Sequence, residues 1–254
     1  MKKLILGGVT SVALMTGPAT AADFPVAALG PPPVVAPMNW QGFYIGASVG
    51  AHFGEDRLSS KTTPGFLISP ALASVIDSTF GGNLQERGAV ATLQGGYNWQ
   101  LGSTVLGIEL DVNGLSAKSS RTLTFVGGNN MISKIDGYGL TTIRPRVGYV
   151  WGPALLYVTG GYAGATVRTT DSFSGFGGTL TLSTSPKTHV SGWTVGTGVE
   201  YGFAPSWSAK FEYLYVDLRG FQTSVAFSPV DVIAFNHKLT DNIVRAGVNY
   251  RFGW

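Results

Sequence analysis

The feature that most constrains this chain is a series of strand-like segments joined by connections that are alternately short and long. In eight segments from Trp40 onward, apolar residues alternate with small or polar ones, which is the period of a half-buried β-strand. We predict strands at about 40–53, 88–100, 103–114, 138–151, 154–168, 189–203, 206–219 and 239–252. The short connections are 101–103, 152–153 and 204–205. The long, polar connections are about 54–87, 115–137, 169–188 and 220–238. This pattern predicts an up-and-down meander with all its short turns at one end.

The two faces of these segments differ in a way that favours a membrane barrel over a soluble β-sandwich. One face is apolar, while the other consists largely of charged residues and glycines, although only 12% of the chain is charged. Aromatic residues gather beside the short turns, as in an interfacial girdle: Trp99, Tyr149, Trp151, Trp207, Tyr250 and Phe252. An even number of strands closes without an edge, which lipid requires because open edges leave backbone groups unpaired. We predict an all-β fold, an eight-stranded antiparallel up-and-down transmembrane β-barrel.

The residues before the first strand predict export. Residues 1–22 have a basic start, a short apolar core and small residues for cleavage after Ala21 or Ala22. Residues 23–39 contain five prolines and predict an extended periplasmic linker, so that the barrel domain spans 40–254. The chain has no cysteine, which excludes disulfides and thiolate metal sites. The net charge of +3 is too small to indicate nucleic acid as a partner.

The polar face must point into the barrel if the apolar face meets lipid. The interior of an eight-stranded barrel is narrow and filled by side chains. The predicted lumen residues are five basic and four acidic ones: Glu109, Asp111, Arg144, Arg146, Glu200, Lys210, Glu212, Arg245 and Arg251. Because buried charges must be paired, we expect an ion-pair network that plugs the lumen. A row of charges lining a narrow channel is the alternative. Pro145 lacks an N–H, and we expect a bulge there.

Other candidate sites are weaker. Residues 46–50 match G-x-S-x-G, but they lie within a strand rather than at the strand-to-helix turn that this motif requires. His52, His189 and His237 fall near the long-loop end and are candidate haem or metal ligands, with rim hydrogen bonding as the alternative. The stretch 65–76, inside the largest long connection, is apolar and could form a loop helix or a partner contact. We predict no catalytic site and no cofactor.

Seven motifs in this order resemble the small outer-membrane β-barrel proteins of alphaproteobacteria, surface-antigen and porin-family proteins related to the OmpA membrane domain. They are WQGFYIGASVG, GGYNWQ, GIELDV, RPRVGY, GWTVGTGVEYGF, KFEYLYVDL and VRAGVNYRF, within 40–254. The resemblance implies the outer membrane of a Gram-negative bacterium. It also implies insertion by the outer-membrane assembly machinery, which reads an aromatic-ended last strand; Tyr250, Phe252 and Trp254 match.

The resemblance leaves function open, because fold alone does not fix it. Family members are described as envelope-stabilising proteins and surface antigens, and a few as haem binders. We expect a structural, surface-exposed role without catalysis, with outer-membrane lipid and lipopolysaccharide as partners. The alternatives are a narrow porin-like channel and a haem-binding, ligand-binding or adhesive protein that acts through its outer loops. The sequence does not indicate an oligomeric state.

Overall fold

The computed structural model describes residues 38–252 apart from 67, 80, 117–118, 126–128, 176–179, 186 and 227. The predicted export signal, most of the predicted linker and Trp254 lie outside the described residues. Among the residues described, no helix is both long enough and apolar enough to cross a bilayer.

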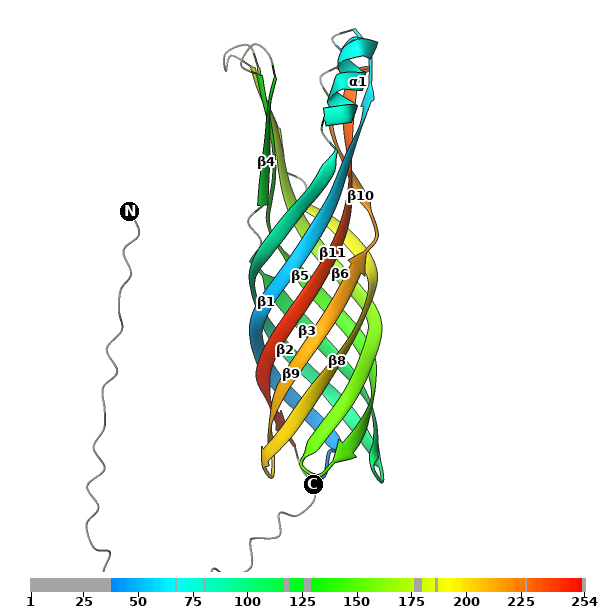
Figure 1. Cartoon of the computed structure of the whole chain (residues 1–254), viewed down its shortest axis with the longest axis vertical. Helices are drawn as coiled ribbons and strands as arrows, with labels where there is room; N and C mark the ends of the chain where they lie inside the picture. Colours follow the sequence, from blue (N-terminus) through cyan, green and yellow to red (C-terminus); the bar gives the residue numbers. More distant parts are fainter. Residues whose placement is uncertain are drawn as a thin grey trace, which may run out of the picture. The chain divides into compact units, whose positions relative to one another are not determined.

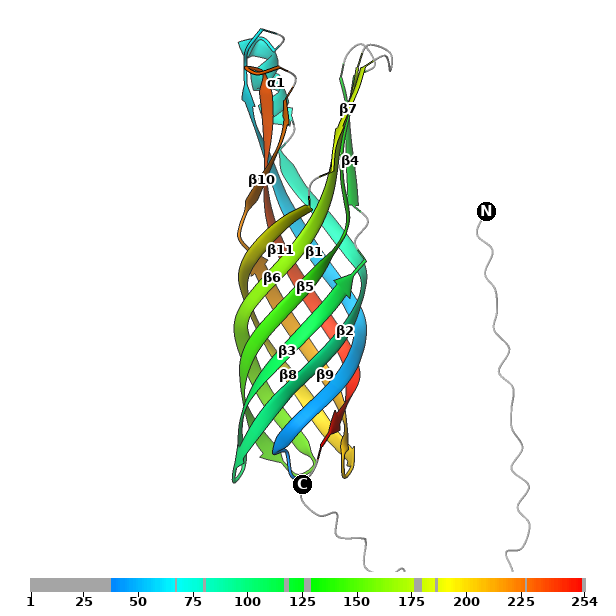
Figure 2. The same ribbon diagram turned by 180° about the vertical axis from the view of Figure 1, so that it is seen from behind.

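Eight long strands close into a ring, as predicted (Figures 1 and 2). They are β1 Gly42–Thr63, β2 Gly82–Leu101, β3 Thr104–Leu115, β5 Asn129–Trp151, β6 Ala154–Gly175, β8 Lys187–Ala204, β9 Trp207–Leu218 and β11 Val232–Arg251. Neighbours pair antiparallel around the ring, and β1 pairs with β11 to complete it. Closure leaves no edge among the eight strands of the ring, which is the condition for crossing lipid without unpaired backbone groups.

The long connections contain more regular structure than the sequence indicated. β1, β2 and β11 extend beyond the ring, and with β10 Phe221–Ala226 and α1 Pro70–Thr79 they form a projection that we call the first tower (Figure 1). β5 and β6 extend likewise, and with β4 Ser119–Phe125 and β7 Leu180–Thr184 they form the second tower (Figure 2). A small apolar cluster packs α1 onto the first tower: Leu58, Ile68, Ala73, Ile76, Val225, Ile233 and Phe235.

The short turns lie together at the opposite end of the ring, as predicted (Figure 1). Gly102 and Gly152 have φ values of +62° and +58° in the turns that join β2 to β3 and β5 to β6. This left-handed backbone favours glycine, which has no Cβ to clash with the neighbouring carbonyl. The sequence therefore fixes these turns locally.

The predicted alternation of faces is confirmed. Large apolar side chains face outward and are roughly half exposed, including Ile45 at 56% and Val195 at 47%, whereas the nine charged residues predicted for the lumen are buried. In β6, which the sequence did not orient, Leu155 and Tyr157 face inward and Val158 faces outward.

The bulge expected at Pro145 is wrong. The pairing of β5 with β6 has the same register on both sides of this residue, with Ile143 opposite Tyr162 and Arg146 opposite Thr159. The hydroxyl of Thr159 donates to the Pro145 carbonyl at 2.9 Å. This bond replaces part of the hydrogen bonding between the strands that proline, which has no N–H, cannot make. The register shift between these strands lies further along, between residues 135 and 138.

Candidate functional site in the barrel lumen

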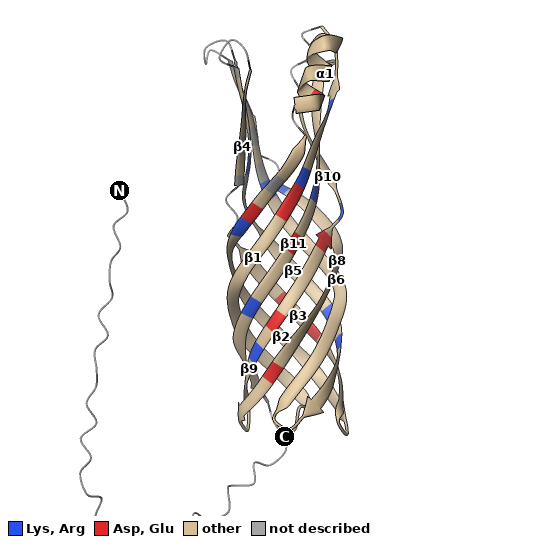
Figure 3. Cartoon of the chain, viewed as in Figure 1, with Lys and Arg blue, Asp and Glu red and all other residues tan. Residues whose placement is uncertain are grey.

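The centre of the lumen holds a network of buried ion pairs. Acidic and basic positions lie on several strands of the ring (Figure 3). Strand register places Glu109 opposite Arg144 on β3 and β5. Arg144 Nη2 lies 2.6 Å from both Glu109 Oε1 and Asp111 Oδ2, and its Nη1 lies 3.3 Å from Glu212 Oε1. One guanidinium therefore joins carboxylates from two separate strands, β3 and β9, across the lumen.

Arg245 and Lys210 complete the centre of this network from the other side of the ring. Arg245 is opposite Glu212 on the paired strands β11 and β9; its Nε donates to Glu212 at 2.8 Å and its Nη2 to Asp111 at 2.8 Å. Lys210 Nζ lies 2.7 Å from Glu109 and 3.3 Å from Glu212. Each of these cations contacts two carboxylates, as burial of charge requires.

Arg146 continues the network toward the short-turn end. Its Nη1 donates to Glu200 at 2.9 Å and its Nε to Asn98 Oδ1 at 2.9 Å. The guanidinium also stacks over the Tyr44 ring, with 4.5 Å from Cζ to the ring centroid. The network therefore includes eight of the nine predicted lumen residues.

Arg251, the ninth predicted residue, lies elsewhere. It sits at the short-turn mouth, donates to the carbonyl of Asn39, and has its Cζ 4.6 Å from the Trp40 ring centroid. Trp40 is fully buried there and packs with Val105, Leu155 and Tyr157. The sequence placed Trp40 in the first strand, but β1 begins at Gly42 and Trp40 instead fills the mouth of the lumen.

A cluster of buried apolar side chains lies in the lumen between the ion pairs and the long-loop end. This layer consists of Val90, Leu115, Tyr138, Leu140, Ala163, Ala165, Val167, Val190, Leu214, Val216, Leu218, Leu239 and Ile243. The lumen thus has three successive layers: Trp40 with its neighbours, the ion-pair network, and this apolar layer. Neither apolar layer was predicted, because the charged residues alone were assigned to the inward face. The same period-two alternation assigns Val90, Leu140 and Val216 to that face.

Polar inward residues that the sequence analysis did not single out support the ion pairs. Asn113 Oδ1 accepts from Arg245 Nη1 at 2.8 Å, and Asn249 Nδ2 donates to Glu200 at 2.9 Å. Ser48, the serine of the G-x-S-x-G match, donates to Gln94 Oε1 at 2.7 Å within the lumen. Ser48 lies in the middle of β1, and its side chain packs inside the lumen.

The three histidines are not brought to one site. His52 Nδ1 lies 3.0 Å from Asp241, and His237 Nδ1 lies 2.8 Å from Asp56; both histidines are buried. His189 is exposed, and its Nδ1 lies 2.9 Å from the Thr166 hydroxyl. Across the described ranges, no three His, Asp or Glu side chains are arranged to hold a metal ion.

Glu86 lies beside Asp56 and Asp241 where the first tower leaves the ring. Its chain neighbours Gln85 and Arg87 are exposed and polar, so this position is beyond the apolar belt. Burial, together with the negative charges of Asp56 and Asp241, raises the pKa of Glu86 to about 7. This carboxyl therefore gains and loses its proton near neutral pH.

The chain matches the family model for the outer membrane protein beta-barrel domain over residues 11–252. The chain belongs to this outer-membrane β-barrel family. The 31 kDa outer-membrane immunogenic protein of Brucella melitensis is 33% identical, with 99% of this chain and 100% of the relative aligned. The 22 kDa outer membrane protein of Rhizobium leguminosarum is 30% identical, with 87% and 82% aligned. The protein is therefore an outer-membrane β-barrel of a Gram-negative bacterium, similar to alphaproteobacterial surface immunogens.

The solved structure of the outer membrane protease OmpT from Escherichia coli is similar in fold. It has a TM-score of 0.50 and 12% identity, covering 84% of this chain and 98% of that one. At this identity the likeness concerns the fold alone.

Proposed function

We propose that this family member is a structural, surface-exposed barrel whose lumen is closed and which performs no catalysis. The observation that carries the proposal is the central network, in which Arg144, Arg245 and Lys210 each contact at least two buried carboxylates. A conducting pathway needs continuous water, and the three successive layers of buried side chains support a pathway that is blocked. Opening the centre would separate charges whose mutual attraction offsets the cost of their burial.

Conductance measurements test this proposal against the channel alternative. The full barrel, reconstituted into a planar phosphatidylcholine bilayer, should leave the membrane silent at moderate voltage. A matched barrel with Trp40→Ala should also be silent, because the network and the apolar layer still block the path. Reproducible single-channel steps from the wild-type protein would refute a closed lumen.

We infer that the last strand carries the signal for insertion by the outer-membrane assembly machinery. The Tyr250 ring lies 5.1 Å from both the Trp207 and Phe252 rings, forming an aromatic edge at the short-turn end. Trp254 lies outside the described residues. Phe252→Ala should slow assembly in membranes that contain the machinery, while spontaneous folding into detergent should be little changed. If Phe252→Ala slowed assembly in these membranes and folding into detergent equally, Phe252 would contribute to stability alone.

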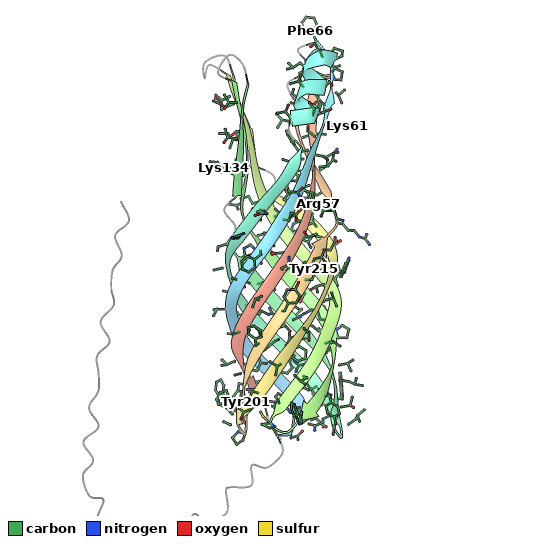
Figure 4. All side chains as sticks on the ribbon, viewed as in Figure 1. Arg57, Lys61, Phe66, Lys134, Tyr201 and Tyr215 are labelled. Carbon is green, nitrogen blue, oxygen red and sulfur yellow. The ribbon has the colours of Figure 1, made fainter. Side chains whose placement is uncertain are left out.

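A second candidate function is contact with an external surface through the first tower. Phe66, at its tip, is 91% exposed, and Val75 and Val230 are 52% and 56% exposed (Figure 4). The tip is held in shape because Asp231 accepts from the backbone N–H groups of Phe66 and Ile68 at 3.0 and 2.9 Å. A rigid exposed aromatic is typical of a binding anchor. Replacing Phe66 by Ser should reduce attachment of cells to a surface that the wild type binds, without changing folding.

A further inference from the structure

Three buried carboxyl groups lie together where the first tower leaves the ring. In the strand register, Gly54 on β1 is opposite both Glu86 on β2 and Asp241 on β11. A Cβ added at Gly54 would lie 3.5 Å from Glu86 Cβ and 3.6 Å from Asp241 Cγ. Asp56, two residues along β1, is also buried on this inward face. Because Gly54 has no side chain, nothing from this position separates Glu86 from Asp241. We call Asp56, Glu86 and Asp241 the junction carboxyls.

The junction carboxyls differ in their partners. His237 Nδ1 lies 2.8 Å from Asp56, and His52 Nδ1 lies 3.0 Å from Asp241. One oxygen of each carboxyl has no hydrogen-bond partner among the described residues: Asp56 Oδ1, Asp241 Oδ1 and Glu86 Oε1. Only 3% of Glu86 is exposed, so a charge on it would be buried beside two other carboxyls. Burial of such a charge is costly unless it is paired.

Glu86 is the junction carboxyl whose charge changes near neutral pH. Among the described side chains, the titratable groups that face it are Asp56 and His52 on β1, Asp241 on β11 and Tyr138 on β5. Burial and, after it, the negative charges of Asp56 and Asp241 raise the pKa of Glu86 from 4.5 to about 7, whereas His52 opposes this rise. Glu86 is therefore neutral at pH 5 and charged at pH 8.

The outer end of β2, residues 82–88, is paired on one side. The pairing of β2 with β3 begins at Val90, so among the described strands residues 82–88 pair with β1 alone. β1 itself stays paired with β11 as far as Thr63, and both strands continue into the first tower (Figure 1). Separation of residues 82–88 from β1 would break one set of strand hydrogen bonds and bring Glu86 into water. Such segments open locally at less cost than the whole fold.

We propose that Glu86 is a proton-operated latch, whose neutral carboxyl keeps the outer end of β2 on β1 and whose ionisation opens residues 82–88. The ionised form is disfavoured in the closed junction because it places a further charge beside Asp56 and Asp241, and opening hydrates that charge. A carboxyl whose pKa is higher in the closed state stabilises that state at low pH. This contribution is lost as the pH rises through about 7. The latch depends neither on a closed lumen nor on contact through Phe66.

The test is hydrogen–deuterium exchange of the full barrel in phosphatidylcholine nanodiscs at pH 5 and pH 8, read by mass spectrometry. Each exchange rate is divided by the intrinsic rate at the same pH, and EDTA keeps divalent cations from replacing the proton. The variant is E86Q. The matched control is E55Q, since Glu55 faces outward opposite Gln85 and lies 3.2 Å from the exposed Arg57 Nε. A shift in gel mobility on boiling confirms that each variant is folded.

In the wild type, the opening equilibrium of residues 82–88 should rise roughly 70-fold from pH 5 to pH 8, given a pKa of about 7 when closed and 4.5 when open. E86Q should lose most of this rise, and E55Q should keep it. Residues 92–98, inside the ring, should show no comparable rise. An equal rise in E86Q and the wild type would overturn the proposal. So would an equal rise in residues 92–98, because the whole barrel would then be opening.

A second variant, D56N, decides the matter if E86Q does not fold. Asparagine keeps a carbonyl oxygen beside His237 but removes one of the charges that repel an ionised Glu86. The rise in opening of residues 82–88 between pH 5 and pH 8 should therefore be smaller in D56N than in the wild type. A rise as large as that of the wild type would contradict the latch. Conductance in phosphatidylcholine separately decides whether the lumen is closed.

Discussion

Replacing Arg146 by alanine should lower the free energy of unfolding of the barrel. The size of the loss is set by the buried groups that contact Arg146. The Arg146→Ala substitution removes the donor that holds Glu200 at 2.9 Å. Among the described residues, Asn249 Nδ2 and Ser208 Oγ remain as donors to that buried carboxylate. It also removes the cation that stacks on Tyr44. Breaking a buried ion pair from one side costs roughly 3–5 kcal/mol, and we expect a loss in that range.

The assay is urea unfolding of the folded barrel in lipid vesicles, followed by tryptophan fluorescence. A second change, Glu200→Gln, made together with Arg146→Ala, should recover about 1–3 kcal/mol because it removes the stranded charge. The control is Arg57→Ala, whose pair with Glu55 is exposed and should contribute no more than about 1 kcal/mol. A loss for Arg146→Ala no greater than that of the control would mean that the lumen is hydrated, and the channel alternative would then be favoured.

Three further predictions concern the ends of the lumen and the first tower. Trp40→Ala should lower the free energy of unfolding by about 3–5 kcal/mol because it empties a buried site; an equal loss for Trp151→Ala, whose side chain is 74% exposed, would refute a special role for Trp40. The pKa of Glu86, raised from 4.5 to about 7, means that the folded state binds this proton more tightly, so stability should fall as pH rises from about 4.5 to 7. Between pH 5 and pH 8, the free energy of unfolding should fall less in Glu86→Gln than in the wild type, by up to about 3 kcal/mol, measured from unfolding curves at both pH values. Parallel profiles of stability against pH for the two proteins would contradict this. Tyr138→Phe should destabilise the barrel modestly, by about 1 kcal/mol, since the hydroxyl donates to Asp241; no change in urea midpoint would show that this bond has no net effect.

The ring could be predicted from the sequence because one local rule operates along every spanning strand. Period-two alternation sets the inward face, and short turns such as that at Gly102 set the order of the strands. Together these predict that Arg144 and Arg146 lie on the strand next to Glu109 and Asp111, since neighbouring strands in a meander must pair, whereas the exact register comes from the structure. The charges of the network followed from the same alternation.

The remainder depended on contacts that the alternation does not encode. Trp40 precedes the first strand, so nothing in the period of two indicated that it folds back into the lumen. The towers form where strands continue past the membrane and pair with partners such as β10, in segments whose polar composition resembled loops. At Pro145 the missing backbone N–H predicted a bulge. Instead, the Thr159 hydroxyl donates to the Pro145 carbonyl and the strand stays regular.

The most direct test of a closed lumen uses the absence of cysteine from the chain. A single cysteine is introduced at Thr194, whose side chain faces the lumen and is 2% exposed, or at Ser103 in an exposed short turn. The folded barrel in detergent is then treated with a hydrophilic maleimide before and after boiling. If the lumen is closed, Ser103→Cys is labelled in both states, whereas Thr194→Cys is labelled only after boiling. Rapid labelling of Thr194→Cys in the folded barrel would show that water and small solutes enter the lumen and would contradict a closed lumen.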